Sequence, residues 1–247
     1  MNVLLILASG KSSRFGGFPK AFCKINNEYV VQRTVNLGKK LFSKIYLVMN
    51  KEIFPVYKDL IKDCKTISIG TGQGDAHSFL RAARFIKADC GADTVTLCWG
   101  DTLFLDDTIF KKASKIELGQ DAVGMSFSSW DKEPYAWYET DGEKIKSSHF
   151  RAKEGIIPVG IHDQSVFVFN LHVICSQLEQ YMMLLGIKDD EDYINNDVSK
   201  EMKLLDSFTF FYEENLLPMN YFLVESGKSY SFNTNEELES IRIRTEI

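Results

Sequence analysis

The sequence predicts an α/β fold with a mostly parallel mixed sheet, helices on its faces and an inserted β-hairpin region. Three observations lead to this prediction. Residues 3–8 form a continuous apolar run, which is typical of a parallel strand buried on both faces. Further apolar runs then alternate with segments of helical spacing. Later in the chain, the turn signal of Asp141 and Gly142 separates two strand-like segments.

The elements are expected in a simple order along the chain. Strands are predicted at residues 3–8, 44–49, 66–69, 94–98, 122–127 and 166–170, with the hairpin at 134–139 and 143–151. Helices are predicted at residues 30–41, 54–62, 76–87, 106–116, 171–185 and 235–241. Two further strands are predicted at 207–213 and 221–224. No linker rich in Gly, Pro or Ser divides the sequence, so residues 1–247 are expected to form one domain, with the hairpin subregion at about 128–165.

Composition excludes several classes of protein. The formal net charge is −5 over 247 residues, whereas a general nucleic-acid binder would show a basic excess. The five cysteines include no CxxC pair, which argues against a zinc ribbon and a disulfide framework. No apolar stretch approaches the length of a membrane span or a signal core. A cytoplasmic location without nucleic-acid or membrane partners is therefore expected, and no oligomeric state is predicted.

The polar stretch ASGKSSRFGGFPKAF, residues 8–22, directly follows the first apolar run. It is not a P-loop, because the first glycine of that motif would fall on Leu5, and the pattern GxGxxG is absent. Gly10 permits a sharp turn at the carboxyl end of the strand, where α/β folds bind ligands. The serines allow backbone N–H groups to face phosphate oxygens, while Arg14 and Lys20 supply two cations. The stretch therefore predicts a triphosphate-binding loop, with a solvated loop as the alternative.

This loop resembles the signature of the nucleotidyltransferases that join NTPs to sugar phosphates, methylerythritol phosphate or phosphocholine. Their pattern is an apolar strand, Ala-Ala-Gly-x-Gly-x-Arg and a later Pro-Lys. The matching residues are Ala8, Gly10, Arg14, Pro19 and Lys20. Ser9 and Ser12 depart from the usual Ala and Gly. The resemblance implies a single-domain Rossmann-like nucleotidyltransferase fold and an enzyme in which a substrate phosphate attacks the NTP α-phosphate and pyrophosphate leaves.

The resemblance also implies roles for individual residues of the loop. Arg14 and Lys20 are expected to be catalytic, because they would neutralise the charge that crowds at the α-phosphate. The residues expected to bind the nucleotide here are Ala8, Ser9, Gly10, Lys11 and Ser12. For Lys11, a solvent-facing loop lysine is an equal alternative.

Two acidic residues are expected to hold Mg²⁺. In TLCWGDTLFLDD, Asp101 follows a buried strand, and a carboxylate beside a triphosphate loop is a natural Mg²⁺ ligand. Gly100 and Asp101 together also resemble the family's metal-binding Gly-Asp pair. In EDYINNDVSKEM, Asp197 matches the Asp-Val pair that completes the family's metal site, although a capping or solvated aspartate is the alternative. Asp106 and Asp107 are interpreted as a helix start.

The stretch GTGQGDAHSFLRAA, residues 70–83, resembles the glycine-bearing loop that lies against the nucleobase in this family. The nucleotide contacts expected here are Gly72, Gln73, Gly74 and Ser78. The alternative is a glycine-rich turn followed by an Asp75 N-cap. His77 is interpreted as a capping or packing residue. Near the end of the chain, FNTNEELES resembles a late family element whose expected role is structural, as a turn and N-cap.

The hairpin region is expected to shape the acceptor site, with Arg151 or Lys153 on the acceptor phosphate; an exposed charged hairpin is the alternative. The chain resembles the cytidylyltransferases that join CTP to phosphorylated glutamine for capsular O-methyl phosphoramidate. An acceptor of that kind would use anionic partners such as Asp131 and Glu154. The alternatives are phosphocholine, a sugar 1-phosphate and a regulator that binds nucleotide without catalysis. Phosphocholine would need an aromatic cage, for which the candidates are Trp130, Tyr135 and Trp137.

Overall fold

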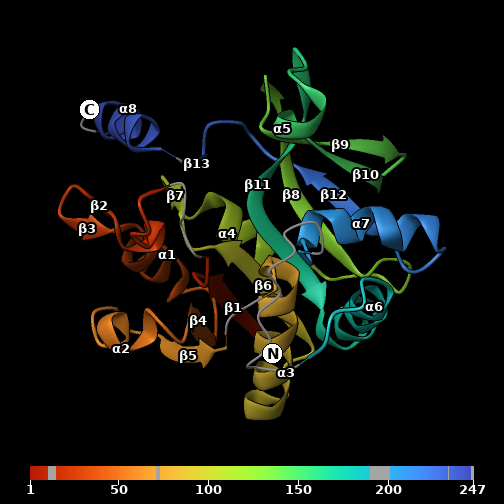
Figure 1. The fold of residues 1–247 in the computed structure, drawn as a ribbon, viewed down its shortest axis with the longest axis horizontal. Coiled ribbons are helices and arrows are strands. Elements are labelled where there is room, and N and C mark those ends of the chain that lie inside the picture. Colours follow the sequence, from red (N-terminus) through yellow and green to blue (C-terminus); the bar gives the residue numbers. More distant parts are fainter. Residues whose placement is uncertain (11–14, 71–72, 190–200, 233, 246–247) are drawn as a thin grey trace.

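The computed structural model describes residues 1–10, 15–70, 73–189, 201–232 and 234–245, and at their centre lies a nine-stranded mixed sheet (Figure 1). The order in the sheet is β5-β4-β1-β6-β11-β8-β12-β10-β9. β1 pairs in parallel with β4 and β6, and β11 pairs antiparallel with β6 and β8. The strands are β1 Asn2–Leu7, β4 Lys44–Asn50, β5 Lys65–Ile69, β6 Thr94–Trp99, β8 Gly124–Lys132, β9 Ala136–Asp141, β10 Lys144–Phe150, β11 Val159–Asn170 and β12 Met219–Leu223. The predicted α/β class is therefore confirmed.

Helices cover both faces of the sheet, so the fold has three layers. One face packs against α3 Asp75–Cys90, α6 Leu171–Leu184 and α7 Leu204–Glu213, and the other against α1 Val30–Gly38 and α4 Thr108–Ala113. Alternate residues of β1 divide between the two cores, since Leu5 faces the first group of helices and Leu4 the second. Burial on both faces explains why this strand is apolar throughout.

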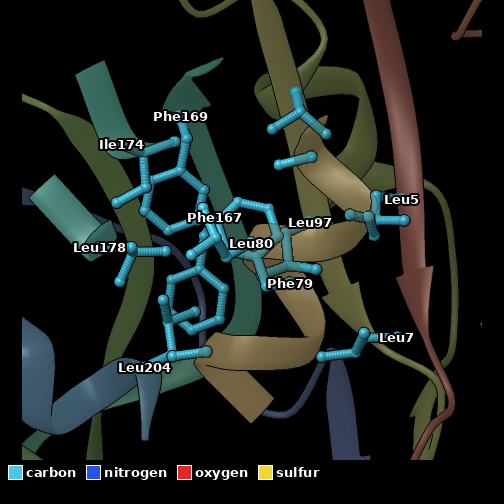
Figure 2. Close-up of a cluster of buried hydrophobic side chains, with 14 of the residues drawn as sticks. Leu5, Leu7, Phe79, Leu80, Leu97, Phe167, Phe169, Ile174, Leu178 and Leu204 are labelled. Atoms are coloured by element: carbon cyan, nitrogen blue, oxygen red, sulfur yellow. The ribbon is translucent and has the colours of Figure 1, made fainter. Parts of the chain in front are cut away.

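Figure 2 shows the core on the α3 side. Phe79 and Leu80 of α3 lie against Leu97 and Phe167 of the sheet, and α6 and α7 add Ile174, Leu178 and Leu204. The rings of Phe79 and Phe169 are 5.1 Å apart. This packing fixes where α3 begins relative to the carboxyl ends of β1 and β6.

Short elements surround the main sheet. A single 3-10 turn spans Lys20–Phe22, and short helices span α2 Phe54–Tyr57 and α5 Arg151–Glu154. Two small ladders join β2 Lys24–Ile25 to β3 Glu28–Tyr29, and β7 Thr102–Phe104 to β13 Ser229–Ser231. The last element, α8 Asn235–Thr245, begins with a capping box in which Thr234 and Glu237 exchange hydrogen bonds of 3.2 and 3.3 Å.

One predicted strand is wrong. Residues 207–213 lie in helix α7, although their aromatic and β-branched residues favour a strand. Leu204, Leu205, Phe208 and Phe211 are all buried, and their spacing fits one face of a helix. Tertiary packing of this face therefore overrides the local preference. Several boundaries also differ. The helix predicted at 54–62 ends at Tyr57, and the one predicted at 106–116 ends at Ala113. The strand predicted at 122–127 continues to Lys132, and β11 starts at Val159.

The topology brings several loops to one end of the sheet. The parallel strands β1, β4 and β6 end there, and the first half of β11 extends beyond Cys98, the last β6 residue with which it pairs. β7, β13 and α5 lie on the same side, at the top of Figure 1. Ligand sites of open α/β sheets lie at this end.

Candidate active site

The ends of β1 and β6 meet at Gly100. Its backbone N–H donates to the Leu7 carbonyl at 2.9 Å. A Cβ added at Gly100 would lie 2.9 Å from the Ala8 Cβ and 3.1 Å from the Leu7 carbonyl oxygen, so a side chain would force the two segments apart. Glycine is thus required for the close approach that sets Asp101 beside the first loop.

Lys20 and Asp101 form an ion pair across this junction. Lys20 opens the 3-10 turn after the first loop, and its Nζ also donates to the Phe232 carbonyl at 3.1 Å. The Lys20 side chain is 17% exposed and that of Asp101 31%, so both keep access to a ligand. The predicted catalytic lysine and the predicted metal ligand, 81 positions apart, therefore share one site.

The first loop is held by a residue that sequence reasoning missed. Asn50, at the end of β4, donates from Nδ2 to the Ser9 carbonyl at 3.1 Å. Its Oδ1 accepts from the N–H groups of Glu52 and Ile53, both at 3.0 Å. The signal available in the sequence was a polar residue directly after an apolar strand. At Gly10 an added Cβ would meet nothing within 4 Å, so the described residues do not show the need for glycine expected there.

Several predicted residues lie outside the described part of the chain. These are Lys11, Ser12, Arg14, Gly72 and Asp197. Within the described ranges no cluster of three or more His, Cys, Asp or Glu residues could hold a metal ion. Asp101 is the described carboxylate at the carboxyl end of β6. One or two carboxylates with substrate phosphates are a common Mg²⁺ environment, so this donor fits the expected ion.

The glycine-bearing loop before α3 is tied to the chain that enters α7. The Gln73 carbonyl accepts from the Met202 N–H at 2.8 Å, and the Met202 carbonyl accepts from the Ala76 N–H at 3.1 Å. Gly74 has φ +116°, and an added Cβ would lie 2.2 Å from the Met202 carbonyl oxygen. Only glycine fits this position. The Leu204 N–H donates to Asp75 Oδ1 at 2.7 Å, which adds a fourth contact.

Two predicted nucleotide contacts of this region, Gln73 and Ser78, have buried side chains. Gln73 is buried and its Nε2 donates to the Lys188 carbonyl at 3.0 Å, while Ser78 is 3% exposed. Asp75 is not the N-cap, since Gly74 occupies that position and Asp75 is the first residue of α3.

In the acceptor region, Arg151 and Lys153 both lie on α5, directly after the hairpin. The Arg151 N–H donates to the Tyr135 carbonyl at 2.8 Å, and its buried Nε has no hydrogen-bond partner. Lys153 is exposed and lies 3.9 Å from Asp206. Arg151 is thus the cation here with an unused buried donor.

The two anionic candidates have partners within the protein. Asp131 accepts from Ser129, Ser226, His162 and Gln164 at 2.6–3.1 Å. Burial raises the pKa of Asp131, but the hydrogen bonds from His162, Ser226 and Ser129 outweigh it and hold the pKa at about 2. Glu154 lies 2.6 Å from His149 Nδ1 on the surface. Asp131 is therefore a structural junction between β8 and β11.

Two of the aromatic residues considered for an ammonium cage, Trp130 and Trp137, lie on opposite faces of the sheet. Trp130 and Tyr138 both pair with Ile161, so they share one face of the sheet, and Trp137 points to the opposite face. The Trp137 ring stacks on His149 at 5.6 Å. Trp130 and Trp137 therefore cannot enclose one ligand between them.

Comparison with known proteins identifies the family of the chain. Residues 4–155, well over half of the chain, match the MobA-like NTP transferase domain. The chain belongs to this family. It is therefore an enzyme, a nucleotidyltransferase, and the Lys20–Asp101 pair lies in the matched region.

Solved structures agree on the fold along the whole chain, whereas no curated protein matches the sequence. One is a putative glucose-1-phosphate thymidylyltransferase from Bacillus anthracis, 13% identical, with TM-score 0.68, covering 99% of this chain and 95% of that one. The CTP:phosphocholine cytidylyltransferase from Streptococcus pneumoniae is 12% identical, with TM-score 0.70 and 98% coverage of both chains. HddC from Yersinia pseudotuberculosis, complexed with GMP-PN, is 17% identical, with TM-score 0.66 and 99% coverage of both. In the described part of this nucleotidyltransferase, no helix is long and apolar enough to cross a membrane.

Proposed function

We propose that this nucleotidyltransferase transfers CMP from CTP to the phosphate of phosphorylated L-glutamine, giving CDP-glutamine and pyrophosphate for capsular O-methyl phosphoramidate. The observation that carries the transfer chemistry is the contact between Lys20 and Asp101 at the carboxyl ends of β1 and β6. CTP and phosphoglutamine rest on the resemblance of the sequence to cytidylyltransferases with that acceptor. The placement of Trp130 and Trp137 on opposite faces of the sheet argues against a cage of these two rings around phosphocholine.

In the proposed reaction, an anionic oxygen of the acceptor phosphate forms a bond to the α-phosphorus of CTP. The bond from that phosphorus to the bridging oxygen breaks, and pyrophosphate leaves with the electron pair. No general base is needed, because the attacking oxygen is already ionised. The residues of the site have to bring the acceptor phosphate and the triphosphate together and to stabilise the negative charge that develops during the transfer.

Lys20 supports this task through its position. Its ammonium is held between Asp101 and the Phe232 carbonyl, so it needs little reorganisation when a triphosphate arrives. Asp101 would hold Mg²⁺, which when bound adds positive charge on the phosphate oxygens. Asn50 holds the Ser9 carbonyl and so fixes the backbone of the phosphate loop. Arg151, half-buried at the start of α5, would place its guanidinium charge beside the acceptor phosphate.

The test is pyrophosphate release with Mg²⁺ across four NTPs and a panel of acceptors. The panel contains phosphoglutamine, phosphocholine, methylerythritol phosphate and several sugar 1-phosphates. Release confined to CTP with phosphoglutamine supports the proposal. Release with another combination of NTP and acceptor would support nucleotidyl transfer but refute the proposed combination of CTP and phosphoglutamine. Binding of CTP without release across the panel favours a regulator that senses nucleotide.

Two variants test the site itself. Lys20→Met and Asp101→Asn are each expected to lower kcat by about a hundredfold or more, the usual scale for losing one charge-stabilising group. The matched control is Asp63→Asn, which removes a surface carboxylate paired with Lys39 at 3.1 Å. The control is expected to keep full activity. If Asp101→Asn turns over at the wild-type rate in Mg²⁺, Asp101 is not a ligand of the metal.

A further inference from the structure

His77 is buried in the first turn of α3 and contacts the glycine-bearing loop. It is 0% exposed, and its Nδ1 accepts a hydrogen bond from the Gln73 N–H at 3.3 Å. Because Nδ1 accepts, the proton of the neutral ring is on Nε2. Nε2 lies 3.3 Å from Asp189 Oδ1. The ring therefore holds the loop through Nδ1 and faces the Asp189 carboxylate through Nε2.

The groups around His77 keep the ring neutral. Burial lowers its pKa most, and the nearby Arg81 and Arg84 lower it further, while Asp189 raises it. Asp189 is itself engaged by both arginines, at 3.2 Å from the Arg81 Nε and in a short contact with Arg84. Arg84 also binds Glu179 of α6 at 2.8 Å. A neutral imidazole is the form that can accept from Gln73.

The Gln73 backbone is held at both of its polar groups. Its N–H donates to His77 and its carbonyl accepts from Met202. On the other side, the Gln73 side chain reaches the Lys188 carbonyl. Without the imidazole acceptor, the Gln73 N–H would be buried and unpaired. An unpaired buried donor favours displacement of the backbone.

We infer that His77 is a positioning residue for nucleotide selection, because its Nδ1 fixes the Gln73–Gly74 backbone where the loop faces the nucleobase. The inference rests on the proposed nucleotide site and extends it to a residue that touches no ligand. The ring acts on binding through the loop, so its loss should affect NTP affinity and base discrimination before it affects the chemical step.

Two substitutions separate this role from simple packing. His77→Asn is smaller than the wild-type ring but keeps an acceptor near the Nδ1 position. His77→Leu keeps much of the volume but has no acceptor. A packing role predicts that the asparagine variant is the more impaired, and the positioning role predicts the reverse. The control is His172→Asn, which changes an exposed histidine on α6.

The first measurement is equilibrium binding of each of the four NTPs with Mg²⁺ and without acceptor. For His77→Leu we expect about tenfold weaker binding of the preferred NTP, a smaller ratio to the others and faster amide exchange at Gln73. For His77→Asn we expect nearly wild-type values, even if its melting temperature falls.

Either of two outcomes would overturn the inference. One is wild-type affinity and discrimination in His77→Leu, and the other is equal or greater impairment of binding in His77→Asn. Because the assay contains no acceptor, an incorrect phosphoglutamine assignment leaves its result intact. If the wild type binds no NTP, the proposed function itself fails, and this inference with it.

Discussion

The half-buried carboxylate of Asp75 lowers stability at neutral pH, and its removal should stabilise the fold. Burial raises the pKa of Asp75 to about 6, against backbone hydrogen bonds from Leu204 and Ala76 that lower it, and the nearby Glu201 and Asp206 add to the rise. The ordinary value is 3.8. This difference corresponds to about 3 kcal/mol of unfolding free energy, which is fully present below pH 3.8 and lost as pH rises through 6.

Asp75→Asn keeps the oxygen that accepts from the Leu204 N–H but carries no charge. We therefore expect the variant to be more stable than the wild type by up to about 3 kcal/mol at pH 8, and equally stable at about pH 3, where the carboxyl is protonated in both states. The assay is urea unfolding of both proteins at the two pH values, with Asp63→Asn as the control for an exposed carboxylate. A gain of the same size at both pH values, or no gain at pH 8, would refute the reasoning.

Two further predictions concern Gly74, which packs against Met202, and the ion pair of Asp131 and His162. Gly74→Ala would place a Cβ against the Met202 carbonyl at φ +116°, so we expect a loss of about 3 kcal/mol in urea unfolding and weaker NTP binding; an unchanged midpoint would contradict this. The pKa of His162 is raised because Asp131 and Asp163 outweigh the effect of burial, and the pKa of Asp131 is about 2. The stability from this pair is thus full between about pH 4 and 6.5, falls as pH rises through the raised pKa of His162, and falls in acid through the pKa of Asp131. Asp131→Asn should cost most within that window, and a cost independent of pH from 5 to 9 would show that the ion pair contributes nothing.

Sequence patterns were sufficient for the strands that build the centre of the sheet. Both strands are buried on both faces, so β1 is apolar from Val3 to Leu7 and β6 is mostly apolar, with the buried Thr96 as a polar exception. A short run of this kind is typical of a buried parallel strand. Helix α7 was missed because its period becomes visible only when Leu204 and Leu205 are included with Phe208 and Phe211. The window that begins at Ser207 contains aromatic and polar residues in an order that suits a strand.

In the candidate site, too, some contacts could be predicted from the sequence and others could not. The approach of Lys20 and Asp101 follows from the rule that parallel strands share their carboxyl ends, so both could be placed from sequence. The contacts of Met202 with Gln73 and Ala76 could not, because they join backbone atoms and leave no mark on residue type. Gly74 is the exception, since the close approach of the Met202 carbonyl excludes every side chain.

These contacts give the two halves of the proposed nucleotide site separate supports. The phosphate side depends on Asn50 and on the Phe232 carbonyl, which holds Lys20 from the far end of the chain. The base side depends on His77 and on Met202 at the entrance to α7. The hydrogen bonds on the phosphate side and those on the base side join different residues. Changes at the phosphate side should therefore lower affinity for all NTPs alike, whereas changes at the base side should alter the ratios between them.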